Sequence, residues 1–257
     1  MFNRKKKRQE LRNYENKLLN ENTPFAITEA FKMLRTNLKY TSKNEACPVF
    51  AITSAYAHAG KSIIIANTAL AYAQLGKKVL LIDSDMRCPV INKIFRLENN
   101  LGLSEFLSSS TLDIGDCSKI ISESGIKNLD ILTSGMIPPN PSELLASARV
   151  GEFLAEAKKH YDYIFFDLPP VCEVSDAAVL APNVTGYIFA VRAEATDSRA
   201  VSNALEALKQ AKANVVGFVL NDVDLKSGGK YYKYGKYAYG RDYAASGAEQ
   251  KNKQKTQ

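Results

Sequence analysis

Several features that would assign this chain of 257 residues to a particular class of protein are missing. It has no run of about 18 apolar residues, so we expect no transmembrane helix. Its polar, basic N-terminus lacks the apolar stretch of a secretory signal. The four cysteines show neither metal-ligand spacing nor a pair placed to bridge an iron–sulfur cluster, and we interpret them as reduced thiols of a cytosolic protein. Internal repeats are also missing, which argues against a repeat architecture.

The net charge of +7 is carried by the two ends of the chain. Residues 1–17 contain seven basic and two acidic side chains, and residues 226–257 contain eight and two, which leaves a net charge of −4 between them. The sequence therefore gives no indication of a basic folded face. The basic ends either contact anionic lipid or nucleic acid or remain solvated, and the composition leaves these readings open.

Apolar runs and helical patterns alternate from residue 48 onward. Strands that are apolar throughout and separated by helices indicate a parallel sheet covered on both faces. The predicted fold class is α/β, with a doubly wound, mainly parallel sheet of the P-loop NTPase type. Strands are expected at residues 48–53, 78–82, 129–132, 163–167, 186–191 and 215–220, helices at 28–40, 61–75, 142–160, 175–181 and 197–212, and loops and short helices over 99–128. The predicted organisation is a flexible basic segment over 1–24, one domain over 25–225 and a flexible tyrosine-rich tail over 226–257.

The first predicted strand leads through the turn Gly60-Lys61-Ser62 into a helix. A glycine-rich turn in this place points backbone N–H groups at phosphate oxygens, and the lysine adds positive charge near the β- and γ-phosphates. The serine hydroxyl is a ligand for Mg²⁺ in such loops. We expect Lys61 to be exposed in this loop, and we interpret the loop as a nucleotide site.

Three aspartates follow two other apolar strands: Asp83 and Asp85 after the second, and Asp167 after a later one. Carboxylates at these strand ends can hold Mg²⁺ directly or through water, and one can accept a proton from an attacking hydroxyl. A single aspartate in such a place is more often a turn residue or a helix cap. Three of them on the strands of one P-loop sheet predict nucleotide hydrolysis or phosphoryl transfer.

Four segments resemble the bacterial tyrosine kinases, a family within the partition-type P-loop ATPases. The resemblance covers roughly residues 25–243. Its segments are 79–89, which is similar to the family's modified second Walker motif, together with 29–37, 138–145, and 162–171 with Asp176. It implies an ATP-dependent protein-tyrosine kinase that requires Mg²⁺.

The resemblance also implies roles for individual residues. Asp83 is the implied base on the substrate tyrosine. The implied catalytic residues are Lys61, Asp83, Asp85 and Asp167, the implied Mg²⁺ ligands are Ser62, Asp83, Asp85 and Asp167, and the implied nucleotide contacts are Ala59, Gly60, Lys61, Ser62, Ile63, Arg192 and Asn221. For the last two residues a plain surface arginine and a turn asparagine remain open as readings.

Six tyrosines crowd into the end of the chain among glycines and lysines, with no apolar pattern to bury them: Tyr231, Tyr232, Tyr234, Tyr237, Tyr239 and Tyr243. One reading is a tail phosphorylated by a neighbouring subunit, since phosphate adds negative charge beside the lysines. The other is an aromatic, basic segment that stacks on single-stranded nucleic acid. Beside the kinase-like body we favour phosphorylation and expect no specific nucleic acid.

The resemblance implies several partners. They are a ring-like homo-oligomer, a transmembrane activator of the polysaccharide co-polymerase type, and a cognate tyrosine phosphatase. A cytoplasmic kinase recruited to the membrane by its partner would then regulate capsular or exopolysaccharide synthesis. The subunit contacts would be Glu29, Lys32 and Arg35, although Lys32 stands where the family has an arginine and lacks its bidentate fork.

A second departure lies in the phosphate loop, where His58 replaces a glycine of the family's pattern. This substitution is costly if the position requires a positive φ. Two alternative functions stay open, and His58 bears on the second of them. The chain could be a partition-type or positioning-type ATPase switch without a tyrosine substrate, or a P-loop assembly module that has lost turnover.

Overall fold

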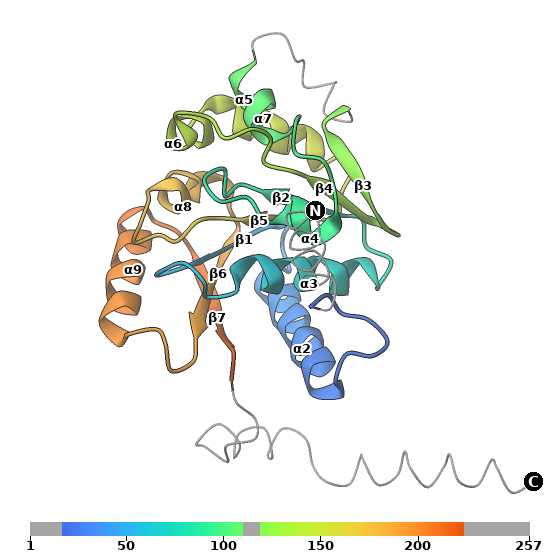
Figure 1. Ribbon diagram of the computed structural model, residues 1–257, viewed down its shortest axis with the longest axis vertical. Helices are drawn as coiled ribbons and strands as arrows, with labels where there is room; N and C mark the ends of the chain where they lie inside the picture. Colours follow the sequence, from blue (N-terminus) through green and yellow to red (C-terminus); the bar gives the residue numbers. More distant parts are fainter. Residues whose placement is uncertain (1–16, 110–118, 224–257) are drawn as a thin grey trace, which may run out of the picture. The chain divides into compact units, whose positions relative to one another are not determined.

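The structure is a computed structural model that describes residues 17–109 and 119–223 (Figure 1). One compact unit ends at Asn221, and the second unit, residues 222–257, contains the predicted tyrosine-rich tail. The six tail tyrosines and Cys117 lie outside the described residues. The other three cysteines are free thiols. Within the described ranges, every helix is too short or too polar to cross a lipid bilayer.

A seven-stranded sheet forms the centre of the unit, in the order β3-β4-β2-β5-β1-β6-β7. All neighbouring strands run parallel except β3, which pairs antiparallel with β4 at one edge. The predicted α/β fold with a mainly parallel sheet is therefore confirmed. The strands are β1 (Val49–Ser54), β2 (Val79–Asp83), β3 (Ile121–Ile126), β4 (Leu129–Leu132), β5 (Tyr163–Asp167), β6 (Gly186–Arg192) and β7 (Val215–Asn221).

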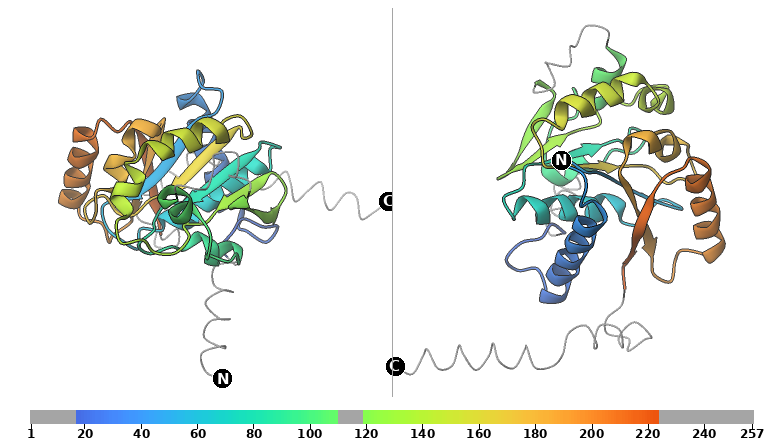
Figure 2. Two further views of the ribbon diagram at one scale, coloured as in Figure 1. Left: turned by 90° about the horizontal axis from the view of Figure 1, so that it is seen from above. Right: turned by 180° about the vertical axis from the view of Figure 1, so that it is seen from behind.

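Helices cover both faces of this sheet, as Figures 1 and 2 show. Side chains of a strand point alternately to the two faces, so Val49 and Ala51 join one apolar core while Phe50 and Ile52 join the other. The helices are α2 (Phe25–Thr41), α3 (Lys61–Ala73), α4 (Ile91–Phe95), α5 (Leu103–Ser108), α6 (Pro141–Leu145), α7 (Ala148–Ala157), α8 (Asp176–Val179), the 3₁₀ helix η2 (Ala181–Asn183) and α9 (Ser198–Gln210). Helices α2, α3 and α4 pack on one face, and α5 to α9 pack on the other.

Two predicted elements differ from the structure. Residues 99–128 contain the edge strand β3, which is mostly polar because it lies at the rim of the sheet and is only partly buried. The single helix expected over 142–160 is divided into α6 and α7, because Ser147 adopts an extended backbone with φ −69° and ψ 151°. No pattern in the sequence was strong enough to predict the short helix α4.

The N-terminal part of the unit is attached to α3 by polar contacts. Asn67 is almost completely buried; its side chain donates to the Lys17 carbonyl at 2.8 Å and accepts from the Leu19 N–H at 2.7 Å. The end of the segment predicted to be flexible, residues 1–24, is therefore held in place from residue 17 onward. Helix α2 packs on α3 through Phe31, Leu34 and Leu38, whereas Ile27 near its start is 43% exposed.

Aromatic packing in the core generates a stability prediction. Phe165 is fully buried, and its ring lies 5.9 Å from that of Phe50 and 5.5 Å from that of Tyr72. We expect Phe165→Ala to lower the free energy of unfolding by about 3–5 kcal/mol, since it removes buried surface and leaves a cavity. Chemical denaturation measures this change. The matched control is Phe218→Ala at a site 56% exposed, and an equal loss there would contradict the assignment of the core.

Candidate active site

The phosphate loop joins β1 to α3 at the carboxyl edge of the sheet. Gly60 precedes the first residue of α3 and has a left-handed backbone with φ 88°, which favours glycine. The Asn221 side chain, at the end of β7, donates to the Ala59 carbonyl at 2.9 Å. A Cβ at position 60 would collide with this side chain. The N-terminus of α3 thus presents backbone N–H groups where an anion can bind, and Asn221 holds the loop that precedes it.

His58 has a φ of 62°, so the loop does require a positive φ at this position. The imidazole is exposed, and the backbone carries the cost that a side chain incurs in this region. The neighbouring Ala57 N–H donates to Oε1 of Glu173 at 2.9 Å. Glu173, which follows β5, was not singled out in the sequence because it belongs to no phosphate-loop pattern. Its carboxylate stabilises the loop from a segment far away in the chain.

Lys61 and Asp167 lie together beneath this loop. Lys61 is only 7% exposed, so the expectation of an exposed lysine was wrong: it is the first residue of α3 and packs into the site. Both carboxylate oxygens of Asp167 are buried, and neither has a hydrogen-bond partner within the described residues. Burial raises the pKa of Asp167 to about 7, although the Lys61 charge and the adjacent Ser62 hydroxyl act to lower it. Unpartnered carboxylate oxygens beside a serine hydroxyl form a donor set that suits Mg²⁺.

Asp83 and Asp85 have different surroundings. Asp83 is fully buried, and its oxygens accept from the backbone N–H groups of Asp85 at 3.2 Å, Val90 at 3.1 Å and Ile91 at 3.0 Å. Burial raises the pKa of Asp83 well above its usual range, and the charge of Asp167 is the second cause of this rise. Asp85 is only partly buried, and its Oδ1 accepts from the Cys88 N–H at 3.0 Å. Asp83 therefore shapes the loop after β2, while Asp85 is the more accessible carboxylate.

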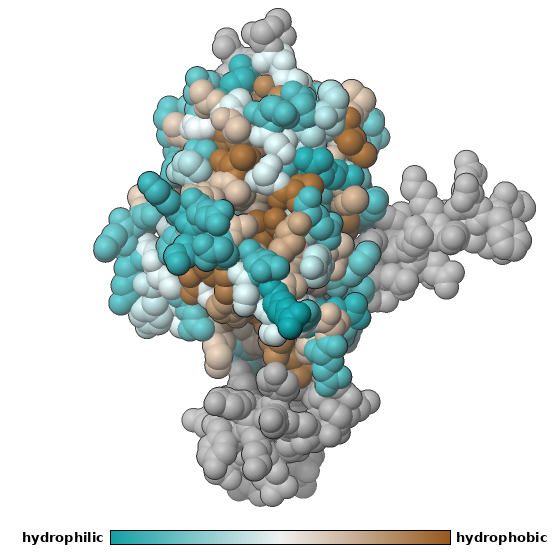
Figure 3. All heavy atoms as spheres, turned by 90° about the vertical axis from the view of Figure 1, so that its left-hand side faces the viewer, coloured by the Kyte–Doolittle hydropathy of each residue, from teal (hydrophilic) through white to brown (hydrophobic). Residues whose placement is uncertain are grey.

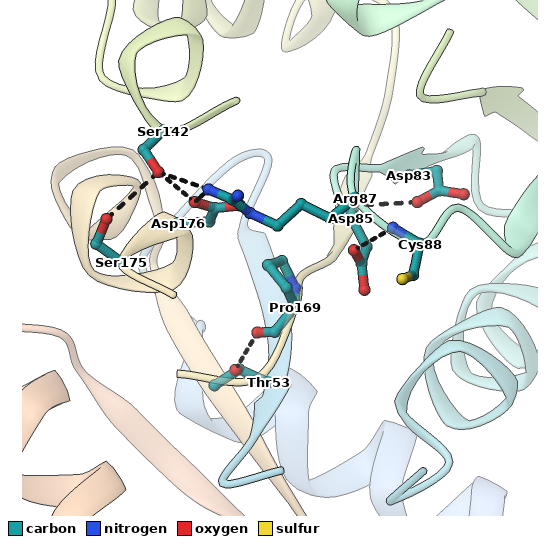
Figure 4. Close-up of polar contacts among 9 residues, drawn as sticks. All are labelled: Thr53, Asp83, Asp85, Arg87, Cys88, Ser142, Pro169, Ser175 and Asp176. Atoms are coloured by element: carbon teal, nitrogen blue, oxygen red, sulfur yellow. Dashed lines mark hydrogen bonds and ion pairs between the residues drawn. The ribbon is translucent and has the colours of Figure 1, made fainter. Parts of the chain in front are cut away.

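Arg87 extends from that loop to the two helices opposite (Figure 4). Its Nε and Nη2 each donate to Asp176 at 3.1 Å, and Nη2 also donates to the Ser142 hydroxyl at 3.1 Å. Ser142 in turn donates to Asp176 at 2.6 Å, and Asp176 is fully buried. This cluster ties the loop that bears Asp85 to α6 and α8. Arg87 and Asp176 belong to segments that resemble the family, but the sequence assigned neither residue a role. Only the fold brings the two side chains together.

The remaining predicted nucleotide contacts lie at the same edge of the sheet. Arg192 ends β6 and is the register partner of Asn221 on β7. The Arg192 N–H donates to the Thr196 hydroxyl at 3.0 Å, which shapes the turn after β6. Ile63, in the first turn of α3, is partly buried and packs against the core. The sheet thus brings the loop residues and these two strand-end residues to one edge.

The three residues predicted to contact a neighbouring subunit lie on α2. Glu29 and Lys32 form an ion pair with each other at 2.6 Å. Arg35 is partly buried, and its Nη1 donates to the Ala71 carbonyl of α3 at 2.8 Å. The hydroxyl of Tyr72 donates back to the Arg35 carbonyl at 2.9 Å. Arg35 therefore attaches α2 to its own subunit, while Glu29 and Lys32 lie at the surface.

Comparisons with known proteins identify the family of this chain. Residues 49–216 match the family described as AAA domain. The putative tyrosine-protein kinase CapB of Staphylococcus aureus is 39% identical over 84% of this chain and 91% of its own length. The chain belongs to the bacterial tyrosine kinases. The tyrosine-protein kinase YwqD of Bacillus subtilis is 38% identical over 81% of the chain and 86% of the relative. The crystal structure of the chimerical protein CapA2B2 superposes with a TM-score of 0.73 at 36% identity and covers 79% of this chain and 88% of that one.

The unpartnered carboxylate of this kinase generates a pH prediction. Folding raises the pKa of Asp167 from an ordinary 3.8 to about 7, so the folded state binds the proton more tightly than the unfolded state. The stabilisation is present at low pH and is lost as the pH rises through about 7. We expect the melting temperature of the metal-free kinase to fall between pH 6 and pH 8, and Mg²⁺ to raise it more at pH 8 than at pH 6.

In Asp167→Asn the melting temperature should fall less between pH 6 and pH 8, since only Asp83 still contributes to the pH dependence. Mg²⁺ should change the melting temperature of this variant little at either pH. The exposed substitution Glu206→Gln is the control and should behave like the unchanged kinase. Thermal unfolding with EDTA and with Mg²⁺ at both pH values measures these quantities. A pH dependence in Asp167→Asn equal to that of the unchanged kinase would contradict the assignment.

The Arg87 cluster generates a second prediction. Arg87→Ala leaves the buried Asp176 without its cation, which we expect to cost about 2–4 kcal/mol of unfolding free energy. The kcat for phosphate transfer should fall more than the KM for ATP rises, because the loop that carries Asp85 loses its support. Arg87→Lys should recover only part of the unfolding free energy and part of kcat, since lysine lacks the bidentate fork. Arg87→Ala combined with Asp176→Ala should be less destabilised than the sum of the two single variants; strict additivity would show that the two side chains are not coupled.

Proposed function

We propose that this kinase transfers the γ-phosphoryl group of ATP to tyrosines in the C-terminal segment of a second copy of the chain. The acceptors would be Tyr231, Tyr232, Tyr234, Tyr237, Tyr239 and Tyr243. The observation that carries the proposal is the buried, unpartnered carboxylate of Asp167 beside Lys61 and Ser62 at the start of a helix. Family membership supports the tyrosine as acceptor, and the crowded tyrosines of the tail support this chain as its own substrate.

The phosphate loop would bind the nucleotide. Backbone N–H groups from Ala59 to Ile63 face the β- and γ-phosphates, and Lys61 neutralises their charge. Ser62 and Asp167 would hold Mg²⁺, with Asp83 and Asp85 in the surrounding shell. Mg²⁺ held by these residues would supply positive charge that offsets the negative charge of the phosphates during transfer.

The acceptor phenol would approach from the open side of the loop after β2. A carboxylate within hydrogen-bond reach accepts the phenol proton as the new bond to the γ-phosphorus forms and the bond to the bridging oxygen breaks, which releases ADP. Sequence reasoning assigned this role to Asp83. Because Asp83 is enclosed and bonded to three backbone N–H groups, we propose that Asp85 contacts the phenol and that Asp83 fixes the loop.

The biological setting is also part of the proposal. We infer a cytoplasmic homo-oligomer that is recruited to the membrane by a transmembrane activator of the polysaccharide co-polymerase type, and a phosphatase that reverses the modification. Regulation of capsular or exopolysaccharide synthesis is the process that the family suggests. Glu29 and Lys32 at the surface of α2 are available for contact between subunits, whereas Arg35 supports them from within its own subunit.

The test distinguishes transfer of phosphate to tyrosine from hydrolysis of ATP. It also distinguishes transfer between two subunits from transfer within one subunit. Lys61→Met should fold, because methionine keeps most of the buried stem, but should lose phosphotyrosine by about a hundredfold or more. In a mixture, the Lys61→Met chain with its own tail is the acceptor, and an active chain with all six tail tyrosines changed to phenylalanine is the donor. We expect phosphate on the acceptor's tail, mapped by mass spectrometry.

ATP hydrolysis by the donor without phosphate on the acceptor would favour the ATPase switch. Loss of nucleotide binding by the unchanged kinase would favour the assembly module. A Lys61→Met chain that modifies its own tail at the normal rate would contradict the phosphate-loop assignment.

A further inference from the structure

Two large apolar side chains, Met136 and Ile137, are exposed in the loop that follows β4. Their exposed fractions are 63% and 66%. Isolated exposed apolar side chains are ordinary, whereas contiguous ones indicate a binding surface. We call this pair the rim patch. Neither the phosphate loop nor the aspartates make use of it in the reaction described above.

Polar contacts hold the backbone of the rim patch in place. Asn99 donates to the Gly135 carbonyl at 2.6 Å and accepts from the Gly135 N–H at 3.0 Å. The Met136 N–H donates to Glu105 at 3.0 Å, and the Met136 carbonyl accepts from the Ser104 hydroxyl at 2.7 Å. The backbone is therefore fixed while the side chains remain in solvent. A rigid exposed surface loses little conformational entropy on binding.

Both ends of the loop are attached to the active site. At one end, Leu132 is the register partner of Ile82, so the loop leaves β4 beside the residue that precedes Asp83. At the other end, Ser142 accepts from Arg87 at 3.1 Å. The rim patch thus lies in the segment that spans from the strand next to Asp83 to the Arg87 cluster. A peptide that delivers a tyrosine to Asp85 would come close to it.

The face of the molecule that carries the phosphate loop shows a matching distribution of side chains. Figure 3 views the structure from the left of Figure 1, and apolar residues form an interrupted band through the middle of this face, with hydrophilic residues on both sides. Glu143 is exposed in α6 directly after the loop, and Asp85 is partly exposed. An occupant with aromatic and basic side chains would suit such a surface.

The chain itself contains a segment of this chemistry. Between residues 229 and 243, six tyrosines alternate with lysines and one arginine. The body between residues 18 and 225 carries a net charge of −4, so a basic segment is attracted to it. Tyrosine rings pack well against methionine and isoleucine, and the lysines can face Glu143 and Asp85.

We propose that the rim patch is the docking platform for the tyrosine- and lysine-rich segment of a second copy of the chain, and that it selects aromatic residues next to the acceptor tyrosine. This deepens the proposed function, on which it rests for the identity of the acceptor. Met136 and Ile137 contact the residues that flank the acceptor, and Glu143 contacts its lysines. The patch thus positions the substrate and takes no part in the transfer of the phosphoryl group.

The test measures peptide binding directly. The protein is the full chain with its six tail tyrosines changed to serine, so that its own tail does not compete. The probe is a fluorescent peptide of residues 229–243, titrated with Mg-ADP present and followed by anisotropy. We expect Met136→Ser with Ile137→Ser to weaken binding roughly tenfold, which corresponds to about 1.4 kcal/mol. Glu143→Gln should weaken it less, and that difference should shrink at high salt.

The matched control is Leu75→Ser, at a residue 61% exposed directly after α3, where the chain has left the phosphate-loop edge. It should leave peptide affinity unchanged. A peptide with serine at every tyrosine should bind weakly to all variants. Thermal unfolding confirms that the substitutions leave the fold intact.

Four results would overturn the proposal. The first two are no binding of the peptide to the starting protein, and equal peptide affinity with and without the rim patch. The other two are a loss of peptide affinity in Leu75→Ser equal to that in the rim-patch variant, and a rim-patch variant that changes the size of the assembly but not the peptide affinity. Transfer of phosphate from ATP to the peptide is measured in parallel with the tail-serine chain. Binding that depends on the rim patch but yields no phosphotyrosine would support the docking surface and refute the proposed function.

Discussion

Two carboxylates on neighbouring strands, both buried, are the constraint on which the rest of the site depends. Asp83 and Asp167 are register partners at the ends of β2 and β5, and burial away from water raises the pKa of both carboxyl groups. The fold compensates the two in different ways. Asp83 receives three backbone hydrogen bonds, whereas Asp167 has the Lys61 charge nearby and no hydrogen-bond partner among the described residues. The uncompensated carboxylate is the one that suits a cation.

The loops around this pair are held by long-range side-chain contacts. Asn221 bonds to the phosphate loop from β7, Glu173 bonds to it from the segment after β5, and Arg87 crosses from the loop after β2 to Asp176. The Thr53 hydroxyl adds a bond of 2.8 Å to the Pro169 carbonyl, which joins the ends of β1 and β5. Each contact links segments that are far apart in sequence. The geometry of the site is thus a property of the whole sheet edge, so substitutions remote from the phosphates can affect transfer.

The sequence of the body is acidic, with a net charge of −4 over residues 18–225, whereas that of the tyrosine-rich tail is basic. Under the proposed function, an unmodified tail of a second copy would be attracted to the site, and a phosphotyrosine would add a charge of about −1.5 to −2 close to Asp83, Asp85 and Asp167. Phosphorylation would therefore favour release of the segment that was just modified. His58 and Lys32, the two departures from the family pattern, leave this arrangement in place: the loop adopts the left-handed backbone despite the side chain, and Lys32 pairs with Glu29.

Local patterns by themselves determined the fold class, the phosphate loop and the aspartates at the strand ends, because strand periodicity and the glycine-lysine-serine turn depend on adjacent residues. Tertiary structure decided what depends on residues distant in sequence. It buried Lys61, enclosed Asp83 while leaving Asp85 accessible, and paired Arg87 with Asp176. It also divided the helix expected over 142–160 and added β3 as a polar edge strand, since burial at these places comes from neighbouring elements and not from local propensity.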